Sequence, residues 1–110
     1  MHGQSVTPLM SKDIPEFPGK EVEMITVQYA AGAVDPIHRH NAHVFVYVLE
    51  GKIIMQVKGG MQRELGPGET FYEGPDDIHT VGRNASKSKP AKFLVFFIKD
   101  KNSPILTPVK

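Results

Sequence analysis

Apolar and polar residues alternate along several short stretches of the chain, and turn-forming residues separate these stretches. Alternation with a period of two is typical of β-strands, in which successive side chains point to opposite faces. The pattern predicts strands at 21–29, 37–40, 44–49, 52–58, 61–65, 70–73, 78–81 and 92–99. No longer stretch has helical periodicity that is free of Gly and Pro. Short strands separated by frequent turn signals predict an all-β barrel or sandwich.

The two ends of the chain lack this regular alternation. Residues 1–20 contain three prolines and little periodicity, so we expect an irregular N-terminal arm with one short strand at Thr7–Met10. Residues 21–100 hold the predicted strands and form the expected barrel. Residues 101–110 contain two prolines and predict a tail that adds at most an edge strand or a dimer contact.

Composition narrows the function classes. The chain has 110 residues, which fits a single domain, and a formal net charge of +1, which gives no electrostatic case for nucleic acid or an anionic membrane as a partner. The absence of cysteine excludes disulfides, thiolate ligands and cysteine nucleophiles. The sequence has no apolar run of membrane-spanning length and no secretory signal at its start. We therefore expect a cytoplasmic location, with a removed signal peptide as the alternative.

Three of the five histidines lie close together, at the start of an apolar run that ends at Gly51. In a strand, His38 and His40 would point to the same face, and two neighbouring imidazoles make half of a metal site. His43 follows three residues later. His79 starts another predicted strand, where an inward-facing imidazole could meet the first two across a small barrel. The sequence thus predicts a metal site built from two separated segments.

Two spaced motifs resemble those of small single-domain cupins. They are Gly32-x5-His38-x-His40 with the apolar strand to Gly51, and Gly68-x5-Gly74-x-Asp76-x2-His79. This resemblance covers residues 21–100. It implies the cupin double-stranded β-helix, a jelly-roll barrel, and a divalent transition metal held by His38, His40 and His79.

The sequence departs from the cupin pattern at one ligand. The family usually has a Glu four residues after the second His, and this position is Val44. His43 is the natural substitute as a fourth ligand, but a bulge at Asn41-Ala42 would be needed to turn it inward. Without a carboxylate the site would be neutral, which slightly disfavours Mn. The sequence does not distinguish among Fe, Ni, Zn, Cu and Mn.

Other residues are assigned by their expected face. Phe45, Tyr47 and Leu49 should pack between sheets or subunits, on the face opposite the lumen. Asp76 and Asp77 are interpreted as turn formers. We expect Gln56, Tyr72 and Glu73 to be surface or rim residues, with a place in the site as the alternative. The candidates for an apolar lumen are Val46, Val48, Met55, Phe71, Phe93, Val95 and Phe97.

The resemblance implies chemistry such as that of dioxygenases, decarboxylases and isomerases. Our leading hypothesis is a dioxygenase-like, metal-dependent oxidoreductase acting on a small aromatic or polyketide-like molecule, because the lumen is apolar and offers no charge for a sugar phosphate. Two alternatives stay open. One is a non-enzymatic module that binds a small ligand or senses metal, which the missing Glu at Val44 would favour. The other is a structural assembly unit. We also expect a homodimer, because barrels of this size have exposed edges.

Overall fold

The computed structural model describes residues 3–104 and 107–108, and all regular elements in this part of the chain are β-strands. The strands are β1 (Gln4–Asp13), β2 (Lys20–Tyr29), β3 (His38–Arg39), β4 (Ala42–Glu50), β5 (Ile53–Val57), β6 (Arg63–Leu65), β7 (Thr70–Glu73), β8 (Ile78–Asn84), β9 (Ala91–Asp100) and β10 (Thr107–Pro108). The all-β prediction is confirmed. No helix that is long and apolar enough to cross a membrane occurs among the described residues.

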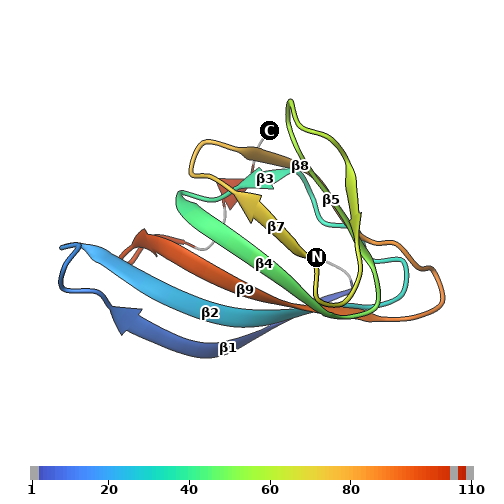
Figure 1. The fold of residues 1–110 in the computed structure, drawn as a ribbon, viewed down its shortest axis with the longest axis horizontal. Helices are drawn as coiled ribbons and strands as arrows, with labels where there is room; N and C mark the ends of the chain where they lie inside the picture. Colours follow the sequence, from blue (N-terminus) through green and yellow to red (C-terminus); the bar gives the residue numbers. More distant parts are fainter. Residues whose placement is uncertain (1–2, 105–106, 109–110) are drawn as a thin grey trace.

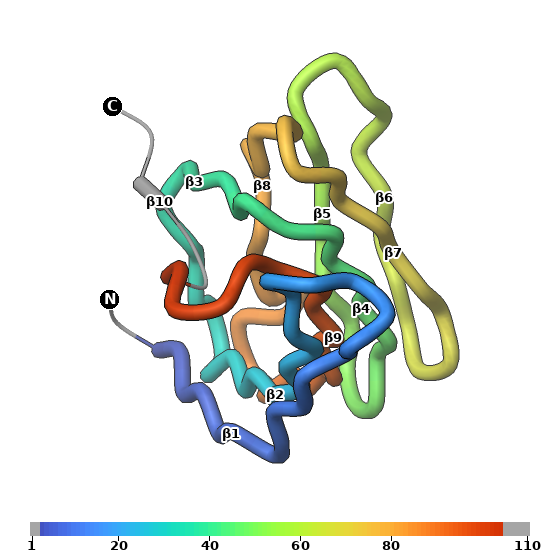
Figure 2. The backbone as a smooth tube through the Cα atoms, turned by 90° about the vertical axis from the view of Figure 1, so that its left-hand side faces the viewer, coloured from blue at the N-terminus to red at the C-terminus, as the bar shows by residue number. Residues whose placement is uncertain are grey.

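The strands form two five-stranded sheets of order β1-β2-β9-β4-β7 and β10-β3-β8-β5-β6. Neighbouring strands are antiparallel throughout both sheets. In Figure 1, β2, β9 and β4 run side by side as long curved ribbons, and β3, β8 and β5 stand over one end of them. Figure 2 shows the same layers from the end of the β1–β2 hairpin. The apolar core fills the space between the two layers.

Side chains in β4 alternate regularly between the core and the outer surface. Val44 and Val46 are buried, whereas Phe45, Tyr47 and Leu49 are among the exposed large hydrophobic residues. The alternation follows from strand geometry, because a pleated strand sends successive side chains to opposite faces. The predicted inner and outer faces of this strand are therefore confirmed.

The N-terminal strand is longer than the sequence suggested. β1 covers Gln4–Asp13 and pairs with β2 along its whole length, whereas we expected a short strand at Thr7–Met10. Its register shifts between Pro8 and Met10, and this irregularity accommodates the proline. β1 lies at the edge of its sheet, where a residue without an N–H is tolerated. At the other end, β10 pairs with β3 as an edge strand, as expected for the tail.

Candidate metal centre

The three histidines expected to form the site come together. His38 in β3 pairs directly with His79 in β8, and His40 follows two residues after His38. Nε2 of His38 lies 3.2 Å from Nε2 of His40 and 3.1 Å from Nδ1 of His79. All three side chains are buried, with exposed fractions of 4–5%. The antiparallel pairing of β3 with β8 thus joins two segments that lie far apart in the sequence.

The structure places His43 outside this cluster. Its side chain is exposed on the outer face of β4, where its Nδ1 hydrogen-bonds with the Tyr72 hydroxyl at 2.6 Å. Ala42 and Val44 on either side of it are buried, and the β4–β9 register is continuous from Ala42 to Val48. The bulge that would have turned His43 inward does not form. Side chains therefore alternate along this part of β4 without interruption, and the imidazole of His43 points outward. The expectation that His43 turns inward to join the site is wrong.

A carboxylate enters the cluster from a neighbouring strand. Glu73 ends β7, is 2% exposed and pairs directly with Val44. Its Oε2 lies 3.3 Å from Nδ1 of His79, and its Oε1 lies 3.8 Å from Nε2 of His40. The expected neutral, all-histidine site is thus corrected to three histidines and one glutamate.

Glu73 was expected to be a surface or rim residue. Its face was predictable, because it stands two positions after Phe71, a candidate lumen residue. The pairing of β7 with β4 was not predictable from the sequence pattern. This pairing is what carries the carboxylate to the place beside Val44.

The donor set and the polar atoms of the cluster fit a divalent transition metal. One ligand atom from each of His38, His40, Glu73 and His79 can be chosen so that all four lie within 4.8 Å of one another. Glu73 Oε1 and His79 Nε2 are the buried side-chain N and O atoms that lack a hydrogen-bond partner among the described residues. An unpaired buried carboxylate oxygen is costly, and a bound cation would offset this cost. Imidazole with carboxylate suits Fe, Mn, Ni, Cu and Zn.

One histidine is oriented by the backbone. Nδ1 of His38 lies 2.9 Å from the carbonyl oxygen of Pro36. Since a carbonyl oxygen only accepts, Nδ1 carries the proton and donates it in this hydrogen bond. In the neutral ring, the lone pair is then on Nε2, the atom that faces His40 and His79. Metal-binding histidines commonly have an outer hydrogen bond of this kind.

Burial governs the charge state of the metal-free cluster. Burial, followed by the charges of Asp77 and Asp35, raises the pKa of Glu73 to about 8. Burial, followed by the nearby His38 and His40, lowers the pKa of His79 to about 3. The 3.3 Å contact between Glu73 and His79 would favour both charged forms, but desolvation outweighs it because both side chains are buried. At neutral pH Glu73 and His79 are therefore both largely uncharged in the metal-free protein.

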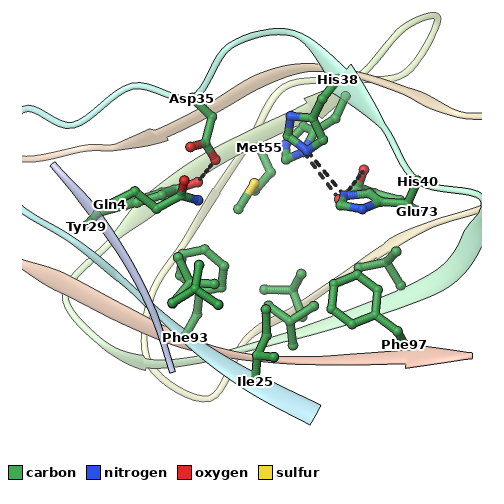
Figure 3. Close-up of a pocket in the computed structure, with 16 residues that line it drawn as sticks. Gln4, Ile25, Tyr29, Asp35, His38, His40, Met55, Glu73, Phe93 and Phe97 are labelled. Atoms are coloured by element: carbon green, nitrogen blue, oxygen red, sulfur yellow. Dashed lines mark hydrogen bonds and ion pairs between the residues drawn. The ribbon is translucent and has the colours of Figure 1, made fainter. Parts of the chain in front are cut away.

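The cluster lies at one side of a cavity of about 130 Å³ between the two sheets (Figure 3). Val46, Met55, Phe93, Val95 and Phe97 line this cavity, as predicted for the lumen. Two other lumen candidates lie elsewhere. Val48 is fully buried in the core, and Phe71 packs against the core with its ring stacked on His79.

The predicted turn after β7 is also present. The Asp77 carboxylate accepts a 2.6 Å hydrogen bond from the backbone N–H of Gly74. The backbone N–H of Asp77 in turn donates to the Gly74 carbonyl oxygen at 3.2 Å. The role of Asp77 as a turn former is therefore supported, and this corner leads the chain from Glu73 to His79.

Two antiparallel sheets enclose a buried cluster of three histidines and one glutamate. This arrangement is that of a cupin jelly roll with a candidate metal-binding site. The family model of the cupin domain matches residues 25–97, and the chain belongs to this family. The fold predicted from the two motifs is thereby confirmed. A search among curated proteins finds no significant match.

Solved structures show the same fold. An oxalate oxidase is 28% identical with a TM-score of 0.74, and the match covers 97% of this chain and 55% of that one. The DMSP lyase DddQ from Ruegeria pomeroyi is 23% identical with a TM-score of 0.69, covering 80% and 43%. A cupin domain of a transcriptional regulator from Enterobacter cloacae is 25% identical with a TM-score of 0.67, covering 89% and 97%. The chain thus spans about half the length of the first two proteins.

Proposed function

We propose that this cupin is a metal-dependent, dioxygenase-like enzyme that acts on a small organic molecule with an aromatic or similarly apolar part. The observation that carries the proposal is the buried cluster of three histidines and one glutamate facing an apolar cavity. Nothing in a structural role requires an unpaired carboxylate oxygen beside three imidazoles in a barrel interior. A metal site accounts for the cost of burying these groups together.

His38, His40, Glu73 and His79 would hold the ion. When bound, such an ion supplies a Lewis acid, with coordination positions not taken by the protein left for O₂ or a chelating substrate. The walls of the cavity determine what fits beside the cluster. The cavity volume of about 130 Å³ is close to that of engineered cavities that bind benzene. The apolar side chains exclude water and favour a substrate of roughly single-ring size.

The comparison with oxalate oxidase supports an oxidative reaction, whereas the lining of the cavity in this chain supports a different substrate. That protein is named for oxidising oxalate, and it shares 28% identity with this chain. Oxalate has no apolar part, whereas Phe93, Val95 and Phe97 line the cavity of this chain. The proposal therefore keeps the class of chemistry and assigns an apolar substrate.

The first test is elemental analysis of protein purified without added metal. We expect about one divalent transition metal ion per chain. The variants His38→Ala and His79→Ala should lose it, and His43→Ala, which removes an imidazole outside the cluster, should keep it. Protein that contains no metal and cannot be reconstituted would overturn the proposal.

The second test is oxygen consumption by the metal-loaded protein with single-ring phenols and small diketones. Uptake that stops on chelation and returns with metal would support the enzyme. A ligand-induced rise in melting temperature without oxygen uptake or product would favour the alternative, a binding module. The cupin domain of a transcriptional regulator favours that alternative, because it matches this chain over nearly its whole length.

A further inference from the structure

A second polar group faces the same cavity as the metal cluster. Tyr29 in β2 has no exposed surface, and its hydroxyl donates a hydrogen bond to Oδ2 of Asp35. Both residues line the cavity. Figure 3 shows Tyr29 and Asp35 at the side of the cavity opposite His40 and Glu73. The cavity therefore holds a second polar group that the metal cluster does not account for.

The position of this pair is fixed by the strand that carries His79. The backbone N–H of Asp35 donates to the carbonyl oxygen of Gly82 in β8 at 2.8 Å. The buried side-chain amide of Asn84, also in β8, donates to the carbonyl oxygens of Tyr29 at 3.4 Å and Ala30 at 3.1 Å. The pair is therefore held in a constant position relative to the cluster, as a preorganised binding group requires.

The Tyr29 ring is also restrained by packing. It contacts Phe93 edge to face, with ring centroids 5.0 Å apart and planes at 71°. Phe93 lines the same cavity from β9. The hydroxyl of Tyr29 is thus directed by both its ring contact and its hydrogen bond to Asp35, so it has little freedom to turn toward other partners.

The proton of this pair stays on the phenol, because a phenol is a far weaker acid than a carboxylic acid. Burial and the neighbouring Asp35 raise the pKa of Tyr29 further. Tyr29 therefore uses its one proton as a donor to Asp35. What the pair offers to a ligand is the remaining lone pairs of the phenol oxygen and of the carboxylate. It can accept hydrogen bonds, and burial, which raises the pKa of Asp35, disfavours a further negative charge beside it.

We propose that Tyr29 and Asp35 form a second anchoring point for the substrate, which binds a hydroxyl or amino group on the side of the cavity opposite His40 and Glu73. The inference rests on the proposed function and narrows the substrate class. The substrate carries an oxygen group that binds the metal, an apolar part, and a hydrogen-bond donor that meets the pair. Dicarboxylates such as butanedioate are disfavoured, because their second carboxylate would meet Asp35.

The test uses protein loaded with Co²⁺ and compares ligands of matched length by calorimetry. The ligands are 4-hydroxybutanoate, 4-aminobutanoate, butanoate and butanedioate, with the series repeated for chains one carbon shorter and longer. The hydroxy or amino acid should bind about tenfold more tightly than the plain acid, the worth of one hydrogen bond. The diacid should bind more weakly than the plain acid. Whether the hydroxy acid or the amino acid gains more affinity over the plain acid shows which group, a hydroxyl or an ammonium, the pair prefers.

Two variants assign this preference to the pair. The double variant Tyr29→Phe, Asp35→Leu removes both acceptors and should abolish the preference for a donor group. Asp35→Asn should reduce the penalty on butanedioate, and it serves as a second variant if the double variant is poorly folded. Tyr47→Phe removes a hydroxyl from the outer face and should change neither quantity. Equal binding of hydroxy and plain acids at all lengths would overturn the proposal.

A metal-free arm separates failure of this proposal from failure of the proposed function. Phenol and toluene have nearly the same size, and phenol differs by one donor hydroxyl. Metal-free protein should bind phenol about tenfold more tightly than toluene, and the double variant Tyr29→Phe, Asp35→Leu should abolish the difference. Protein that holds no metal but keeps this difference refutes the metal enzyme and retains the polar anchor. Protein that holds metal but shows no difference in either arm refutes the anchor alone.

Discussion

The substitution Glu73→Gln should stabilise the metal-free protein and weaken metal binding at the same time. Glu73 is fully buried, and one of its oxygens has no hydrogen-bond partner among the described residues. Its carboxyl resists ionisation in the folded protein, because burial raises its pKa from 4.5 to about 8. Replacing it by a neutral amide of the same shape removes a carboxyl that should destabilise the metal-free protein and that would bind the metal ion.

The magnitude follows from the pKa. A carboxyl with a raised pKa in the folded state gives its full stability below pH 4.5, and this stability is lost as the pH rises toward 8. Once the carboxyl is fully ionised in the folded protein, the free energy of unfolding has fallen by about 5 kcal/mol, and about 3 kcal/mol of this is lost by pH 7. The amide does not titrate, so the metal-free variant should exceed the native protein in stability by at most about 3 kcal/mol at pH 7. The advantage should grow up to pH 8.

The assay is thermal and urea unfolding of metal-free protein between pH 5 and 8, with metal affinity measured in parallel. A gain of about 3 kcal/mol would raise the melting temperature on the order of 10 °C. Metal affinity should fall by at least the roughly ten- to hundredfold that loss of an outer-sphere partner costs. Glu64→Gln, which changes an exposed carboxylate near Lys52, is the control and should have little effect on either property. A destabilised variant at pH 8, or one with native metal affinity, would refute the reasoning.

Four further predictions concern the same site and the outer surface. Gly82→Ala should lower metal affinity, because a Cβ there would lie 3.0 Å from two atoms of the His79 ring and 3.3 Å from Asp35 Oδ2; a metal titration with native affinity would contradict this. Metal binding at pH 7 should release about one proton from Glu73 and strengthen as the pH rises to about 8, measured by calorimetry in buffers of different ionisation enthalpy. The absence of proton release would contradict this. Val44→Glu should restore the metal content lost in Glu73→Val, as elemental analysis of the double variant would show. The exposed apolar face of β4 predicts a homodimer, and a monomer mass in light scattering at micromolar concentration would count against it.

The sequence pattern predicted those features that depend on one strand at a time. Alternation gave the bounds of β7 and the inner and outer faces of β4. The spacing of His38 and His40 placed both imidazoles on one face, and their burial agrees with this. The two-motif resemblance then brought His79 to the same site, because it implied a known way of closing the barrel. Each of these inferences needs only strand periodicity or a fixed motif.

The features that were missed depend on how strands pair. The prolines before residue 20 suggested an irregular arm, but pairing with β2 stabilises β1 over ten residues. His43 could replace the missing Glu only if a bulge turned its side chain inward, and this bulge was assumed in order to complete the cupin motif. The continuous register of β4 with β9 shows that ordinary alternation prevailed. Such pairings are set by contacts between distant segments, and the sequence pattern does not encode them locally.

The position of Glu73 also changes what the missing motif residue means. Directly paired residues on one face of a sheet have Cβ atoms about 5 Å apart, so a carboxylate on β7 opposite Val44 can reach the same interior space as one on β4. The loss of Glu from the first motif therefore does not imply the loss of a carboxylate from the site. The case for a non-enzymatic module that rested on Val44 alone is weakened accordingly. Since burial raises the pKa of Glu73 and its Oε1 has no hydrogen-bond partner among the described residues, its presence is better explained by binding a cation than by packing.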